Sequence, residues 1–241
     1  MMHILLLGAS LDSLLLSSHL RANDHTVTIV EIEAEIGLPL HHPGRVLEIS
    51  HFSDFFTQEQ MEFLALHEND DGWGCRWEWV LKHVAHRVAQ LGVLCLLRTR
   101  VLDVQQDADL YHVTFSSNER NVPTNLTVDT IIDMQPRGQK VPGHRRHAPL
   151  PSSLPSYPFP EQEPWMGGMA LFSTVQDENP DVDLVLRHAD GLVELWWKGP
   201  QRWLPANGFI ETCRVDLPSD IDEISFDAIV RRVNSFAASI V

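Results

Sequence analysis

The chain has 241 residues, 44% of them hydrophobic, and a formal net charge of −15. This length and composition allow one large domain or two small ones with a buried core. The excess of acidic residues disfavours nucleic acid and anionic membrane surfaces as partners, because both require a basic protein surface. No apolar run approaches the roughly 20 residues of a membrane helix, so we expect a cytoplasmic protein.

The first thirty residues predict a β-α-β unit. His3–Leu7 is an apolar run that stops at Gly8, Leu11–Arg21 suits a helix, and Thr26–Val30 is β-branched throughout. Two parallel strands joined by a helix are the physical meaning of that order. We predict a nucleotide-binding domain of the Rossmann type from Met1 to about Pro136.

The next elements are predicted from the spacing of apolar residues and from the glycines and prolines that interrupt regular structure. Residues 37–56 contain two glycines and two prolines and are expected to be irregular, and a helix is expected over 57–67. From Arg76 to Leu91, apolar residues recur every three or four positions, which favours a helix. Four strands then follow, the middle two as an antiparallel meander: 93–97, 101–104, 111–115 and 127–133.

The second half begins with a proline-rich stretch over 136–165. Because proline lacks a backbone donor, we expect an extended connection there and neither a helix nor a central strand. Its basic quartet, 144–147, is expected to be a solvated loop. Four strands are predicted after it, at 169–175, 182–187, 192–198 and 209–215. Asp190-Gly191 predicts a hairpin, and a helix is expected from Ser225 to Ile240.

These elements together predict an α/β protein. Residues 1–150 are expected to form a Rossmann-like nucleotide-binding domain, a mainly parallel sheet with an inserted β-meander. Residues 151–241 are expected to form a smaller β-rich cap for the substrate, ending in a helix. The oligomeric state does not follow from the sequence.

The loop after the first strand carries a reduced form of the phosphate-binding pattern. Dinucleotide folds use three glycines there, for the turn, for the approach of the pyrophosphate and for helix packing. Here only the first is a glycine, because serines replace the other two, and Asp12 adds a negative charge that would repel a pyrophosphate. The cofactor loop is predicted to comprise Gly8, Ser10, Leu11, Asp12 and Ser13.

Glu31 follows the second strand at about the spacing of the acid that binds an adenosine ribose. An acid there also disfavours the 2′-phosphate of NADP. The alternative is a solvated residue at the end of a strand.

Three segments resemble, in the same order, flavoproteins of the amine oxidase, hydroxybenzoate hydroxylase and lycopene cyclase type. Ile4–Gly37 is similar to their opening strand, loop, helix and strand, with Glu31 and Gly37 at matching positions. Arg76–Ser117 is similar to a segment with a T-x-V motif, here Thr99-Arg100-Val101, and Val128–Pro136 resembles a strand that returns under the cofactor. The family's Ala-x-Gly after that strand and its late Gly-Asp motif are absent from the sequence.

The resemblance implies FAD as the cofactor and an FAD/NAD(P)-binding Rossmann-like domain over residues 1–150. It places Val101 close to the adenine, mainly through its backbone, and Arg45 near the flavin, its pyrophosphate or an anionic substrate. A surface arginine is the alternative for Arg45. No cysteine or carboxylate stands at metal-ligand spacing from the paired histidines, so no metal site is expected.

The leading hypothesis is an FAD-dependent oxidoreductase-like protein that binds a dinucleotide cofactor and a small-molecule substrate of unknown identity. The flavin would supply the redox chemistry, and no catalytic acid or base can be named. A second hypothesis is a non-catalytic relative that has lost its cofactor and acts as a binding or assembly protein. A third is an NAD-dependent Rossmann enzyme of another family.

Overall fold

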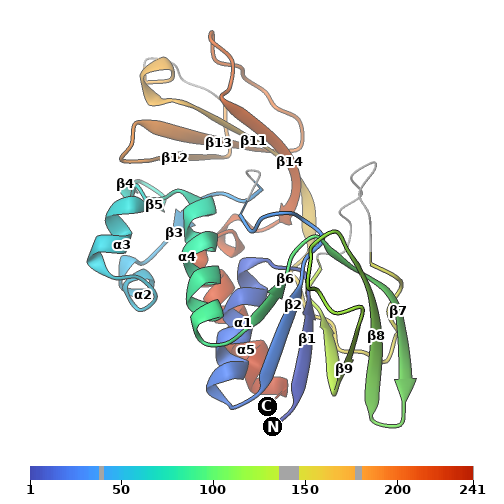
Figure 1. The fold of residues 1–241 in the computed structure, drawn as a ribbon. Coiled ribbons are helices and arrows are strands. Elements are labelled where there is room, and N and C mark those ends of the chain that lie inside the picture. The colour runs from blue at the N-terminus through green and yellow to red at the C-terminus, as the bar shows by residue number, and fades with distance from the viewer. Residues whose placement is uncertain (38–40, 136–146, 177–180, 241) are drawn as a thin grey trace. The chain divides into compact units, whose positions relative to one another are not determined.

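The computed structural model of the protein describes residues 1–37, 41–135, 147–176 and 181–240. The described chain forms two compact units that are interleaved in sequence (Figure 1). Unit 1 comprises residues 1–36, 83–158 and 232–241, and unit 2 comprises 37–82 and 159–231. The predicted division into domains 1–150 and 151–241 stays a prediction. Most of the predicted basic loop, 144–146, lies outside the described residues.

Unit 1 contains a parallel four-stranded sheet, which confirms the predicted fold class. The order β10-β1-β2-β6 is formed by β1 (His3–Leu7), β2 (Thr26–Val30), β6 (Leu94–Leu96) and β10 (Thr130–Asp133). Helix α1 (Leu11–Ala22) joins β1 to β2 and lies beside them (Figure 1). The apolar run of β1 is fully buried from Leu5 to Leu7, as expected for a parallel sheet covered on both faces.

An antiparallel meander completes unit 1. It consists of β7 (Thr99–Asp107), β8 (Leu110–Ser117) and β9 (Asn125–Val128). The single strand predicted at 127–133 is divided at Asp129, because β9 pairs with β8 while β10 pairs with β1. The Asp129 carboxylate accepts the N–H of His3, and the Asp129 N–H donates to the His3 carbonyl, so this residue forms the corner between the two sheets.

Unit 2 contains an antiparallel sheet of order β12-β13-β11-β14. Its strands are β11 (Gln162–Leu171), β12 (Leu184–Arg187), β13 (Leu192–Lys198) and β14 (Glu211–Pro218). The hairpin predicted at Asp190-Gly191 is confirmed, with Gly191 at φ +83° between β12 and β13. Three fully buried tryptophans pack on the sheet: Trp165, Trp196 and Trp197.

The expectation that 136–165 contains no part of a central strand is wrong, because β11 begins at Gln162 and includes Pro164. Pro164 pairs with β14, and its carbonyl accepts the N–H of Gly199, just after β13 has ended at Lys198. The nitrogen and carbonyl of one strand residue face the same side. The missing proline N–H therefore faces the end of β13, where no ladder bond is lost.

Short elements complete the chain. In unit 2, β3 (Arg45–Val46), β5 (Gly72–Gly74) and β4 (His67–Asn69) form a small sheet. Helix α2 (Ile49–Ser53) lies in the stretch predicted to be irregular, and the helix predicted over 57–67 is limited to α3 (Gln58–Phe63). Two 3₁₀ turns span Phe172–Thr174 and Ile221–Glu223. The longer helices α4 (Trp77–Gln90) and α5 (Phe226–Ile240) match their predicted ranges closely.

Within the described ranges, no helix is both long enough and apolar enough to cross a membrane. The described residues also contain no group of three or more His, Cys, Asp or Glu that could hold a metal ion. The three cysteines are free thiols.

Candidate functional site

The predicted cofactor loop begins with a glycine turn at the end of β1. Gly8 has φ +102°, a conformation that favours glycine. Its N–H donates to the carbonyl of Val30 at 2.9 Å. A Cβ at Gly8 would lie 3.3 Å from the carbonyl oxygen of Met134, which follows β10. The turn therefore needs its glycine both for its backbone angle and for its close approach to the neighbouring strand.

The two serines that replace glycines have structural roles at the start of α1. Ser10 is the N-cap residue, and its hydroxyl accepts the N–H of Ser13 at 3.3 Å. The two hydroxyl oxygens lie 3.2 Å apart. Ser13 is fully buried, as a small residue must be where the helix packs on the sheet, and the Leu11 side chain belongs to the core. Ser10 thus satisfies one of the helix donors that a phosphate would otherwise accept from.

Asp12 lies in a buried polar cluster of unit 1. Its carboxylate is 3.6 Å from the guanidinium of Arg232 on α5, and its side chain is only 8% exposed. Burial raises the pKa of the Asp12 carboxyl, while the charge of Arg232 and a hydrogen bond from Tyr157 oppose that rise. Burial and then the charge of Asp12 raise the pKa of Tyr157, so this hydroxyl stays protonated. The negative charge expected at the loop is therefore buried and compensated.

Glu31 contacts the loop directly. Its carboxylate accepts the N–H of Ala9 at 2.8 Å and the N–H of Glu33 at 3.0 Å. The first bond joins the end of β2 to the glycine turn, and the second closes the turn that follows β2. Glu31 therefore lies beside the loop, as its predicted ribose-binding role requires, and it also holds the loop in place.

A cavity of about 210 Å³ lies beside the end of β2 in unit 1. It is lined by residues 32–34, by residues 98–100 at the start of β7, and by Ser116 and Asn118. Two of these residues, Arg98 and Arg100, bring positive charge to a strongly acidic protein. Binding pockets for drug-sized ligands are usually above about 300 Å³, so this cavity suits one part of a dinucleotide rather than all of it.

Val101 is in β7, next to the cavity, and its backbone is engaged by another segment of unit 1. Its N–H donates to Nδ1 of His147 at 3.0 Å, and its carbonyl accepts the N–H of Ala148 at 2.9 Å. The pKa of His147 is lowered to about 4, first by burial and then by the charge of Arg100. Its imidazole is therefore neutral near pH 7 and can accept this bond.

Arg45 lies in unit 2 and is buried, with 5% of its surface exposed. Its guanidinium donates to the carbonyls of Asp71 at 3.0 Å and Ile221 at 2.6 Å, and lies 3.7 Å from the carboxylate of Asp222. These contacts give Arg45 a structural role in unit 2. Its predicted contact with phosphate or substrate stays a prediction.

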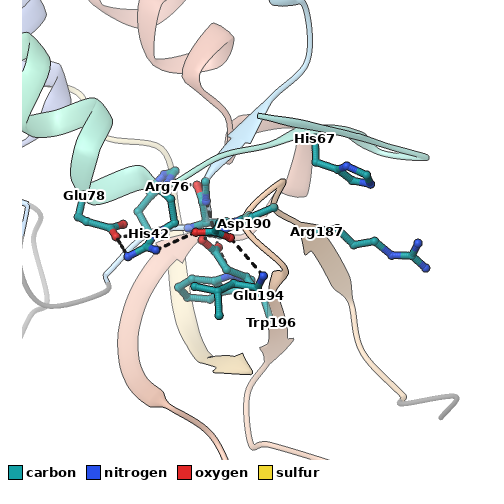
Figure 2. Close-up of polar contacts among 12 residues, drawn as sticks. His42, His67, Arg76, Glu78, Arg187, Asp190, Glu194 and Trp196 are labelled. Carbon is teal, nitrogen blue, oxygen red and sulfur yellow. Dashed lines mark hydrogen bonds and ion pairs between the residues drawn. The ribbon is translucent and has the colours of Figure 1, made fainter. Parts of the chain in front are cut away.

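A buried polar cluster lies at the hairpin of unit 2 (Figure 2). The Glu194 side chain is fully buried and accepts hydrogen bonds from the Gly44 N–H at 3.1 Å and from Trp196 Nε1 at 2.9 Å. Its other oxygen lies 3.2 Å from Nε2 of His188, which is also fully buried. Burial, then the charge of Glu194, raises the pKa of the Cys75 thiol well above its usual range, so this thiol is not a nucleophile.

Nearer the surface, Arg76 joins α4 to the hairpin turn. Its guanidinium forms ion pairs with Glu78 and with Asp190, the latter at 3.0 Å (Figure 2). Beside it, the rings of His42 and Trp77 stack with centroids 4.3 Å apart. The stacking on Trp77 gives His42 a structural role in packing.

Sequence reasoning missed several residues of these sites. Glu194 carried a signal, because an acid inside the apolar strand Leu192–Lys198 indicates a buried, partnered charge. Arg232, Tyr157 and His147 carried none. Their partners lie far away in sequence, and no local pattern connects them.

No protein-family model matches the chain, and no curated protein matches it. Solved structures do. The p-nitrophenol 4-monooxygenase PnpA from Pseudomonas putida superposes with a TM-score of 0.65 at 12% identity, over 99% of this chain and 80% of that one. CtdE, solved in complex with FAD, has a TM-score of 0.52 at 9% identity, over 84% of this chain and 62% of that one.

A flavoprotein/dehydrogenase from Cytophaga hutchinsonii has a TM-score of 0.51 at 16% identity, over 82% of this chain. The chain spans 56% of that protein's length. Together these likenesses show that the chain has the fold of FAD-dependent flavoprotein oxidoreductases.

Proposed function

We propose that this protein is a flavoprotein of the oxidoreductase type that binds FAD in unit 1. The observation that carries the proposal is the loop between β1 and α1. A glycine turn, the start of a helix and an acid at the end of the next strand stand together there, in the order that dinucleotide folds use. Fold likeness alone would not assign a function.

Two features of the residues around the loop support the binding of phosphates there. The buried pairing of Asp12 with Arg232 removes the strongest objection, since the carboxylate does not face a bound phosphate as a free charge. The Ser10 hydroxyl can donate to a phosphate oxygen, and the start of α1 favours anions. The neighbouring cavity has room for the adenosine end only.

In this proposal the flavin supplies the electron transfer, and the chain supplies its position. Gly8 and Ser10 would hold the pyrophosphate, and Glu31 would keep the loop in place. The substrate is a small molecule that stays unidentified. The β-rich region predicted over residues 151–241 is the proposed substrate-binding part.

The test uses the purified protein with FAD and with FMN, which lacks the adenosine half. We expect the yellow absorbance of oxidised flavin and a higher melting temperature with FAD but not with FMN. A ligand at 100 times its Kd stabilises the folded state by about 2.7 kcal/mol, or roughly 5–10 °C for a chain of this size. A colourless protein whose melting temperature does not change in excess FAD refutes the proposal.

A second candidate function is supported by a specific observation. Both backbone groups of Val101 are already bonded to His147 and Ala148, which favours a relative that keeps the fold without the cofactor. Such a protein would act as a binding or assembly protein. It is distinguished by the same titration, because no adenine nucleotide would then change its stability.

A further inference from the structure

At the edge of β7, the backbone N–H and the carbonyl of Val101 both face away from the sheet. In the order β7-β8-β9, β7 is an edge strand. Val101 lies opposite Phe115 of β8, and the Phe115 N–H donates to Thr124 instead of to β7. The Val101–Phe115 pair is therefore not hydrogen-bonded, and the N–H and carbonyl of Val101 point away from β8.

The chain itself covers this edge with two described residues. The neutral imidazole of His147 accepts the Val101 N–H at its Nδ1, so its proton is on Nε2. The Ala148 N–H donates to the Val101 carbonyl. An aromatic nitrogen acceptor and an adjacent N–H donor thus face the strand side by side.

This pattern is the one that an adenine edge presents. Adenine places a ring-nitrogen acceptor, N7, beside the donor N6–H₂. A planar heteroaromatic ring with this pattern can therefore replace His147 and Ala148 bond for bond, whereas an adenine with two methyl groups on N6 has no donor there and cannot. The cavity next to this edge is lined in part by Arg100, the residue before Val101.

We propose that His147 and Ala148 form an intramolecular cover that imitates adenine on a base-binding edge at Val101, and that an adenine nucleotide must displace this cover to bind. The proposal rests on the proposed function for its ligand class and adds a means of regulating that site. The cover competes with the base for the same two backbone groups. Its removal raises affinity for adenine nucleotides without creating any new contact.

The test measures by calorimetry the affinity of the full chain for ADP and for N6,N6-dimethyl-ADP, which lacks the N6 donor. His147→Ala removes the imidazole acceptor. Ala148→Pro removes the N–H that donates to the Val101 carbonyl and leaves the imidazole in place. This second variant tests the proposal if His147→Ala folds poorly. His112→Ala is the matched control, since His112 is an imidazole on β8 whose Nδ1 bonds Thr127 at 3.0 Å, away from this edge. Circular dichroism establishes that each variant is folded.

We expect His147→Ala or Ala148→Pro to bind ADP about tenfold more tightly than the natural chain, the scale of one or two net hydrogen bonds. The affinity for N6,N6-dimethyl-ADP and the affinities of His112→Ala stay unchanged. Equal ADP affinity in the natural chain and both cover variants overturns the cover and leaves the proposed function standing. A gain for N6,N6-dimethyl-ADP as large as that for ADP overturns the adenine mimicry. Absence of ADP and FAD binding in every folded variant overturns both proposals.

Discussion

The buried carboxylate of Glu194 provides a sharp test of the energetics of unit 2. Glu194→Ala leaves the Gly44 N–H and the Trp196 Nε1–H without their acceptor and leaves His188 buried without its partner. Breaking a buried pair by removing one member typically costs about 3–5 kcal/mol. We expect a loss of that size in the free energy of unfolding, or a melting temperature lower by about 10 °C.

The assay is equilibrium unfolding in urea, followed by tryptophan fluorescence. Asp181→Asn is the matched control, because its ion pair with Arg202 is on the surface and the Asp181 side chain is 79% exposed. Such pairs contribute about 0–1 kcal/mol. If Glu194→Ala loses no more stability than Asp181→Asn, the reasoning from burial is refuted. The double variant with His188→Ala should then show no coupling, whereas we expect about 1–3 kcal/mol.

Three further predictions concern substitutions in unit 1. Ser10→Ala removes the cap of the Ser13 N–H and should lower stability by about 1 kcal/mol in urea unfolding; an unchanged midpoint would contradict the cap. Because the folded pKa of His147 is lowered to about 4, the unfolded chain binds this proton more readily between about pH 4 and 6.5. Stability should therefore fall as the pH drops through that window, by at most about 1.4 kcal/mol per pH unit, and His147→Gln should remove this slope. Asp12→Ala removes the carboxylate beside Arg232 and should lower the free energy of unfolding by about 1–3 kcal/mol. The affinity for FAD, measured by titration, should not change. A marked gain in FAD affinity would show that the Asp12 charge opposes the ligand.

The opening β-α-β unit could be predicted because its signals are local. The bounds of β1 and β2 follow from an apolar run that a glycine ends and from five β-branched or apolar residues in a row. Each signal lies inside the element it defines. The same holds for the hairpin at Gly191, where the turn needs a positive φ.

The parts that could not be predicted depend on distant partners. Pro164 is tolerated in β11 only because β13 has ended beside it, and no residue near Pro164 records where another strand ends. Asp12 lies in the first turn of α1, where the sequence also places it, but the surroundings of its side chain depend on Arg232 and Tyr157. The bond between Val101 and His147 likewise joins two segments whose local patterns are unrelated.

The interleaving of the two units has a consequence for how the protein is made. Unit 1 includes the segment that begins at Arg232, whose Val233 and Ala237 are buried and whose Phe236 ring packs against Tyr157 at 5.1 Å. Domains usually fold as they leave the ribosome, at about 5–20 residues per second. Here β1 and β2 emerge roughly 10–50 s before α5 at those rates. During that time the residues of unit 1 that pack against this segment, such as Tyr157, lack their native contacts.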